Sequence, residues 1–163
     1  MIETVTFNNR EYPKFHTTGF AAQYAFPFAR QVCHGIGYDI GCMKREWAFP
    51  GATPIDITFD DGWHATNLPE GRVDYIFSSH CLEHVPDWVG VIDYWTTRIK
   101  SGGTLFLYLP CYEEDYWRPW NNRKHMHILT PQYLQDWMIH KKMKHIFVSE
   151  RDLYNSFSAM CEI

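Results

Sequence analysis

The sequence predicts an α/β protein with a mostly parallel sheet, and three observations lead to this prediction. Short apolar runs alternate with helical patterns along the chain. Glycine and proline fall singly between these runs, as they do at the ends of elements. The run Gly37-Tyr38-Asp39-Ile40-Gly41-Cys42 is a strand pattern that enters a glycine turn, and Asp56 stands at the end of the next apolar run. This order is typical of parallel sheets that hold the ribose of a nucleotide-like cofactor.

Residues 1–34 are expected to form an N-terminal helical segment, with a helix over residues 18–32. Pro27 is expected to kink this helix. Its aromatic residues recur at a spacing of four on one face, at Phe20, Tyr24 and Phe28. We expect this face to pack on the rest of the domain.

Residues 35–163 are expected to form the sheet domain. Its predicted strands are 36–40, 53–57, 73–77, 104–109, 145–148 and 157–163, with a short extended piece at 63–65. Between Gly41 and Thr53 the chain has 11 residues. A parallel crossover normally takes a dozen or more residues and usually contains a helix. The first crossover helix is therefore expected to be shortened or missing.

Two helices are predicted in the second half of the chain. The first starts at Asp87, and Gly102-Gly103 are expected to stop it. Its apolar positions are Trp88, Ile92, Trp95 and Ile99. The second starts at Thr130-Pro131, where threonine caps the first turn and proline is tolerated in it.

Length and composition restrict the class of protein. A chain of 163 residues is expected to be one domain, residues 1–163, able to bury roughly 70% of the surface of its unfolded chain. It has 15 Lys and Arg against 19 Asp and Glu, net −4, and no basic run, so nucleic acid is not an expected partner. The polar N-terminus lacks the pattern of a signal peptide, and no apolar run has membrane-spanning length. We expect a cytoplasmic protein without membrane contact.

Three blocks of the sequence together resemble the class I S-adenosylmethionine-dependent methyltransferases, especially their small-molecule branch. The blocks are the segment 38–42 with Asp56, the segment Val73 to Val85 with Leu82-Glu83-His84, and the segment Arg98 to Leu105 with its Gly-Gly. The resemblance implies a Rossmann-like sheet, mostly parallel, with an antiparallel C-terminal strand. It also implies S-adenosylmethionine as the cofactor.

The resemblance implies cofactor contacts at several positions that follow predicted strands. Asp39, Gly41 and Cys42 would lie against the methionine part, and Asp56 would accept hydrogen bonds from the ribose hydroxyls, next to Ile57. The expected contacts beyond these are His64 and Ala65 at the adenine end, and Ser79 and His80 beside the sulfonium. The family often has an aspartate where this chain has His64, which is a departure from its pattern.

The first loop departs further, because Met43-Lys44-Arg45 stands where the family has glycines. A left-handed backbone at a residue other than glycine costs roughly 1 to 2 kcal/mol. Lys44 and Arg45 are expected to bind the cofactor's carboxylate, in place of the missing helix N-terminus. This expectation rests on the short crossover.

Candidate catalytic residues are histidines near the end of the strand at 73–77. Methyl transfer from a sulfonium depends mainly on alignment, and a base is needed only if the acceptor must lose a proton. His80 is the first candidate, because imidazole titrates near neutral pH, and His84, Glu83 and His127 follow it. Alternatively, Glu83 and His84 start or cap a helix and bond only to the backbone.

The expected acceptor is a small molecule or a glycan-like compound, and a homodimer is a possible assembly. The loop 112–120 combines acidic and aromatic residues and is interpreted as an acceptor-binding lid, with a surface loop fixed by its tryptophans as the alternative. An alternative function is a methyltransferase-like scaffold that has lost catalysis and serves as a partner or regulatory subunit. A nicotinamide-dependent oxidoreductase is disfavoured, because no Gly-x-Gly-x-x-Gly follows Gly41.

The five cysteines form no Cys-x-x-Cys pair and are expected to be reduced thiols. Cys42, Cys81 and Cys111 each follow a predicted strand, and with His80 they could hold zinc. Buried cysteines far more often act as small apolar residues. No metal is predicted.

Overall fold

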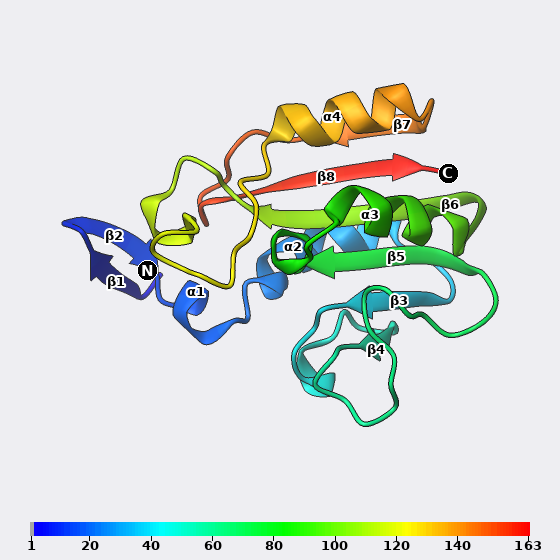
Figure 1. The fold of residues 1–163 in the computed structure, drawn as a ribbon, viewed down its shortest axis with the longest axis horizontal. Coiled ribbons are helices and arrows are strands. Elements are labelled where there is room, and N and C mark those ends of the chain that lie inside the picture. The colour runs from blue at the N-terminus through cyan, green and yellow to red at the C-terminus, as the bar shows by residue number, and fades with distance from the viewer. Residues whose placement is uncertain (1) are drawn as a thin grey trace.

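The computed structural model describes residues 2–163, without the side chains of residues 15 and 16. Its main feature is a six-stranded sheet in the order β4-β3-β5-β6-β8-β7 (Figure 1). The strands are β3 Gly37–Ile40, β4 Thr53–Ile55, β5 Val73–Ser79, β6 Ile99–Pro110, β7 Lys144–Val148 and β8 Ser156–Glu162. The first four strands run parallel, and β8 lies antiparallel to both β6 and β7. The predicted mostly parallel sheet with an antiparallel C-terminal strand is confirmed.

Helices cover both faces of this sheet. They are α1 Phe15–Thr18, α2 Ala22–Val32, α3 Trp88–Thr97 and α4 Pro131–His140. Helix α2 packs on one face against the β-strand rings Phe77 and Phe106. Helices α3 and α4 pack on the other face, where Ile76 and Leu105 point. Successive residues of β5 and β6 thus serve two cores, because side chains alternate along a strand.

The crossover from β3 to β4 contains one short 3-10 helix, η1 Arg45–Trp47, in place of an α-helix. The predicted reduction of the first crossover helix is therefore confirmed. Further 3-10 turns follow the next two strands, η2 Leu82–His84 after β5 and η3 Asp115–Trp117 after β6. The carboxyl ends of β3, β5 and β6 lie at the same edge of the sheet (Figure 1).

The N-terminal segment differs from the prediction. It was expected to be helical, but it contains an antiparallel hairpin, β1 Thr4–Phe7 and β2 Arg10–Pro13. The turn residues Asn8 and Asn9 both have positive φ, the geometry that favours two-residue hairpin turns. The hairpin lies beyond the carboxyl edge of the sheet (Figure 1), where Phe7 and Tyr12 contact the ring of Tyr116. The predicted helix also starts later, at Ala22.

Two other element boundaries were predicted wrongly. Helix α3 ends at Thr97, before Gly102-Gly103, and β6 already starts at Ile99. Ile99 is apolar because it is buried as the first residue of β6. It also happens to stand at the next apolar position of the helical pattern, although it is not part of the helix. The extended piece expected at 63–65 is only an isolated bridge between His64 and Asn67.

The starts of α3 and α4 were predicted correctly. Asp87 accepts a hydrogen bond from Gly90 N at 2.9 Å and caps α3. Thr130 Oγ1 accepts one from Tyr133 N at 3.1 Å and caps α4. None of the helices within residues 2–163 is long and apolar enough to cross a membrane.

Candidate functional site

A cavity of about 300 Å³ opens directly beyond the ends of β3 and β4. Its wall includes Gly41 after β3, and Asp56 and Ile57 after β4. His64 and Ala65 line it from the following loop, and η2 contributes His84. All six of these residues are site candidates predicted from the sequence. In open α/β sheets, ligands bind in this position, outside the carboxyl ends of the strands.

Gly41 allows the chain to turn tightly at the cavity wall. Its φ is +86°, and a Cβ added here would lie 2.4 Å from the Cβ of Cys81 and 2.5 Å from its Sγ. The left-handed conformation and the contact with the next parallel strand's loop both require glycine. The Cys81 side chain thus occupies part of the space that a side chain at position 41 would need.

Asp56 is held in a fixed orientation by the loops around it. Its carboxylate accepts hydrogen bonds from Met43 N at 2.7 Å, from Thr58 N at 2.9 Å and from Thr58 Oγ1 at 2.8 Å. A carboxylate has about four acceptor positions, so it can take a further donor from a ligand. His64, across the same cavity, has Nδ1 3.1 Å from Thr66 Oγ1.

Asp39 lies behind the cavity wall. It is 1% exposed, and its Oδ2 accepts a hydrogen bond from Phe49 N at 2.6 Å. Burial raises the pKa of this carboxyl to about 7, against the lowering effect of that hydrogen bond. In this structure Asp39 holds the short crossover to the sheet. Cys42 is likewise buried and is not part of the wall.

In the loop Met43-Lys44-Arg45, which stands where the family has glycines, the lysine and arginine side chains do not line the cavity. Met43 adopts the left-handed conformation, with φ of 62°, whereas Lys44 is extended. Lys44 Nζ lies 4.2 Å from the centre of the Trp47 ring. Arg45 forms a 2.9 Å ion pair with Asp61. Neither cation lines the cavity, so the expected contact with the cofactor's carboxylate would require both side chains to move.

Ser79 is the last residue of β5 and His80 comes directly after it, but neither side chain lines the cavity. Ser79 Oγ is buried and has no hydrogen-bond partner within the described residues. His80 has φ of 48°, and its Nε2 lies 3.0 Å from Ser156 Oγ. Positive φ is uncommon at residues other than glycine, but histidine adopts it more often than most, and His145 has the same φ.

Three histidines surround the carboxylate of Glu83 in η2. From Glu83 Oε1, the distances are 4.0 Å to His80 Nδ1, 3.8 Å to His84 Nε2 and 3.9 Å to His125 Nε2. The main-chain oxygen of Glu83 accepts hydrogen bonds from Met126 N at 2.8 Å and His127 N at 3.3 Å. These bonds attach the segment before α4 to η2 and bring His125 into the cluster.

Burial controls the protonation of this cluster. It raises the pKa of the Glu83 carboxyl to about 8 and lowers that of His125 to about 4, with a smaller lowering from His84. Burial also lowers the pKa of His84. Near neutral pH both imidazoles are therefore mainly uncharged. Glu83 was among the candidate bases named from the sequence, but His125 was missed. The signal for His125 was the pairing of His80-x-x-Glu-His with His125-x-His.

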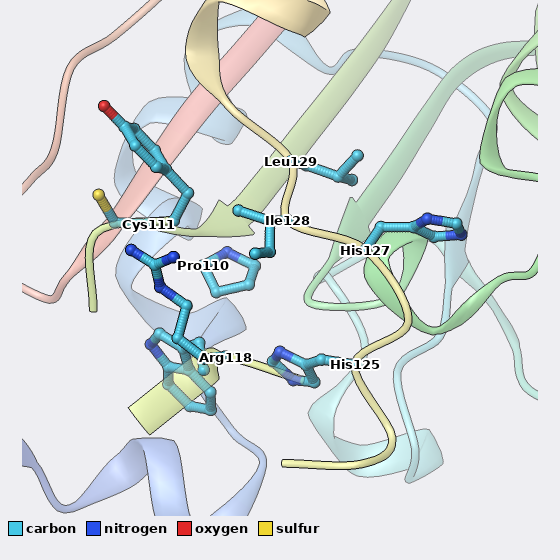
Figure 2. Close-up of a pocket in the computed structure, with 9 residues that line it drawn as sticks. Pro110, Cys111, Arg118, His125, His127, Ile128 and Leu129 are labelled. Carbon is cyan, nitrogen blue, oxygen red and sulfur yellow. The ribbon is translucent and has the colours of Figure 1, made fainter. Parts of the chain in front are cut away.

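A second, much smaller cavity of about 10 Å³ lies on the other side of His125 (Figure 2). Such a volume is close to that needed for one water molecule. His127 is among the residues that line this small cavity, and the His127 ring points away from Pro110 and Arg118 (Figure 2). Its Nε2 lies 2.8 Å from the main-chain oxygen of Val85 and 3.0 Å from that of Pro86. The His127 ring therefore bonds to the backbone, which is the non-catalytic role that the sequence analysis gave as the alternative for His84.

The cysteines after the strands are free thiols. Burial raises the pKa of the Cys42 thiol to about 12, and it also raises those of Cys81 and Cys111. Neutral thiols are poor metal ligands, because the thiolate is the binding form. Within the described residues, the cluster of metal-ligand type consists of Glu83, His84 and His125 and includes no cysteine.

Comparison with protein families gives a match that covers most of this chain. Residues 18–143 match a family described as a methyltransferase domain. The chain belongs to this methyltransferase family. The comparison with curated proteins found no significant match.

Solved structures with a similar fold are S-adenosylmethionine-dependent methyltransferases. A Thermotoga maritima methyltransferase, described as a possible histamine N-methyltransferase, is 14% identical, with TM-score 0.64 and coverage of 91% of this chain and 92% of its own. Bradyrhizobium japonicum NodS with S-adenosylhomocysteine is 12% identical, with TM-score 0.58 and coverage of 91% and 87%. A Haloferax volcanii putative methyltransferase in complex with the Trm112 activator is 13% identical, with TM-score 0.60 and coverage of 88% and 88%.

These findings confirm the family, the fold class and the cofactor predicted from the sequence. Among the solved structures of this fold, NodS holds S-adenosylhomocysteine. The six candidate residues on the cavity wall fit this molecule in kind, since a carboxylate, apolar surfaces and a close backbone approach are present together. The roles of the individual residues remain predictions.

Proposed function

We propose that this methyltransferase binds S-adenosylmethionine in the cavity beyond β3 and β4 and transfers its methyl group to a small-molecule or glycan-like acceptor. The observation that carries the proposal is the position of Asp56 and Gly41 on one wall of that cavity. Asp56 would accept hydrogen bonds from the ribose hydroxyls, since its carboxylate is already oriented by Met43 N and Thr58 N. Ile57, His64 and Ala65 would enclose the adenine end.

The methyl group would face the end of β5. Cys81 and His84 both line the cavity there, whereas Ser79 and His80, which precede Cys81 in the chain, do not. Transfer requires an acceptor atom in line with the sulfur and the methyl carbon, so alignment supplies much of the acceleration. Where the acceptor carries a proton, His84 is the histidine best placed to remove it, because it lines the cavity and burial keeps it neutral.

The acceptor would approach beside the loop after β6. Trp117 in η3 stacks on His125, with ring centres 5.4 Å apart. Glu114 is buried and paired with Arg151. Trp120 is exposed and offers an aromatic face of the kind that binds flat rings and sugars.

Calorimetric titration with S-adenosylmethionine and S-adenosylhomocysteine tests the cofactor site. We expect micromolar binding by the native chain, about −8 kcal/mol. Asp56→Ala should weaken binding at least tenfold. Asp60→Ala removes an equal charge from an exposed position in the same loop and should bind like the native chain.

Two outcomes would count against the proposal. No binding at millimolar ligand would favour the alternative of a non-catalytic scaffold. Equal binding by both variants would place the cofactor elsewhere. If the cofactor binds but no methyl transfer is found with a panel of acceptors, a protein partner becomes the next test, since the Haloferax volcanii relative was solved with an activator.

A further inference from the structure

The cluster around Glu83 has the composition and spacing of a metal site. One ligand atom from each of Glu83, His84 and His125 lies within 4.8 Å of the other two. Glu83 and His84 come from η2, and His125 comes from the segment before α4. Residues about forty positions apart in sequence therefore converge on one point.

The distances within the cluster are close to those of a ligand shell. With metal-ligand bonds of 2.0–2.2 Å, two ligand atoms lie about 3.4 Å apart in a tetrahedral site and at most about 4.2 Å apart in any geometry. Glu83 Oε1 lies 3.8 Å from His84 Nε2 and 3.9 Å from His125 Nε2. The ligand atoms of the two imidazoles lie within 4.8 Å of each other, so these side chains would have to move closer by roughly an ångström to surround an ion.

The carboxylate of Glu83 lacks the partners that its burial requires. Glu83 is 1% exposed, and neither of its side-chain oxygens has a hydrogen-bond partner within the described residues. Buried polar groups are nearly always paired, and an unpaired one lowers stability. A cation between Glu83 and the imidazoles would satisfy the carboxylate.

The two imidazoles are oriented as ligands. His84 Nδ1 lies 2.8 Å from the main-chain oxygen of Lys124, which can only accept, so Nδ1 carries the proton. Its Nε2 is left as a lone pair toward Glu83. A hydrogen bond from the outer nitrogen of a histidine to a carbonyl is usual at metal sites. The ring of His125 is held by stacking on Trp117, at an interplanar angle of 9°.

We propose that Glu83, His84 and His125 bind one divalent transition-metal ion of the zinc type. Two imidazoles and one carboxylate suit such an ion, whereas magnesium and calcium prefer oxygen ligands. His80 Nδ1 lies 4.0 Å from Glu83 Oε1 but is outside the group of three mutually close ligands. His84 also lines the larger cavity, so the ion would lie beside the proposed cofactor site. The metal site does not depend on the proposed cofactor site, but while the ion is bound to Nε2, His84 cannot act as the base, because its Nδ1 already carries a proton.

The test measures zinc bound to the purified chain after chelation and dialysis against zinc. We expect one equivalent in the native chain and at least a tenfold loss of affinity in Glu83→Gln and in His125→Gln. His140→Gln is the matched control, because His140 lies exposed at the end of α4, outside the cluster. It should bind like the native chain. Cobalt is a second probe, since a tetrahedral site with nitrogen ligands gives visible absorption bands.

Two results would overturn the metal site. One is the absence of stoichiometric zinc in the native chain, and the other is zinc binding that survives all the cluster substitutions. If Glu83→Gln does not fold, His84→Gln replaces it, since His84 is partly exposed and tolerates change better. Titration of the same samples with S-adenosylmethionine tells the two proposals apart, because either can succeed while the other fails.

Discussion

Gly41 is the residue where one added carbon atom is expected to disturb the site most. Gly41→Ala is expected to destabilise the fold in two ways. A left-handed backbone at alanine costs about 1 to 2 kcal/mol, and overpacking against Cys81 costs about 1 to 3 kcal/mol. Gly51→Ala is a matched control, because Gly51 also has positive φ, +90°, but has no atom within 4 Å of an added Cβ. We expect Gly41→Ala to lower the free energy of unfolding more than Gly51→Ala does, by the overpacking contribution. Urea denaturation measures both.

Equal losses in the two variants would mean that Cys81 moves aside without cost. A double variant then tests the contact directly. Gly41→Ala in a Cys81→Gly background should cost less than Gly41→Ala in the native chain if the contact between these residues is responsible, since Cys81→Gly removes both the Cβ and the Sγ that the added Cβ faces.

At the level of single residues, the sequence was informative where a residue directly follows a strand. Gly41 and Asp56 lie on the cavity wall because the parallel strands end at one edge of the sheet. The sequence was not informative about long side chains: Arg45 turns to Asp61 and Lys44 to Trp47. It was also not informative about His125, whose position depends on backbone hydrogen bonds to Glu83.

The caps of α3 and α4 act at the level of elements. Thr130→Ala removes the acceptor for Tyr133 N and should lower the free energy of unfolding by about 1 kcal/mol. Thr130→Ser keeps a hydroxyl in the same place and should stay close to the native chain. Chemical denaturation followed by circular dichroism measures the difference. If Thr130→Ala and Thr130→Ser lose the same stability, the methyl group rather than the cap is responsible.

Element types were predicted well where burial and periodicity agree. β5 and β6 are apolar on both faces because both faces carry helices. The hairpin β1-β2 was missed because each strand has only four residues, although Thr4 to Phe7 alternates polar and apolar residues. The Asn8-Asn9 turn was its signal. The end of α3 was missed because Ile99 satisfies the core both as the next helical position and as the first residue of β6.

The whole molecule consists of one sheet between two cores, with its site at the carboxyl edge. This arrangement leaves two acidic side chains only 1% exposed, Asp39 at the crossover and Glu83 at η2. Both have raised pKa values through burial. The stability of the molecule is therefore expected to depend on pH in a range where most carboxyls are already ionised.

Asp39 gives a pH dependence with a definite sign. Its pKa is 3.8 when unperturbed and about 7 in the folded chain. Between these values the folded state keeps a proton that the unfolded state has lost, so the free energy of unfolding falls as pH rises, by up to about 1.4 kcal/mol per pH unit. The contribution is complete below the unfolded pKa and is lost as pH approaches the folded one.

Asp39→Asn isolates this contribution, because the amide oxygen can still accept the hydrogen bond from Phe49 N without titrating. The comparison with the native chain is needed since other groups titrate in the same range: Glu83 acts with the same sign, and His125, with its lowered pKa, acts with the opposite sign. Urea denaturation of both chains with a chelator, at several pH values from about 4 to about 8, gives the difference. We expect Asp39→Asn to gain stability relative to the native chain as pH rises. Parallel curves would show that Asp39 ionises alike in the folded and unfolded states, and that the buried carboxylate finds compensation at the crossover beyond the amide of Phe49.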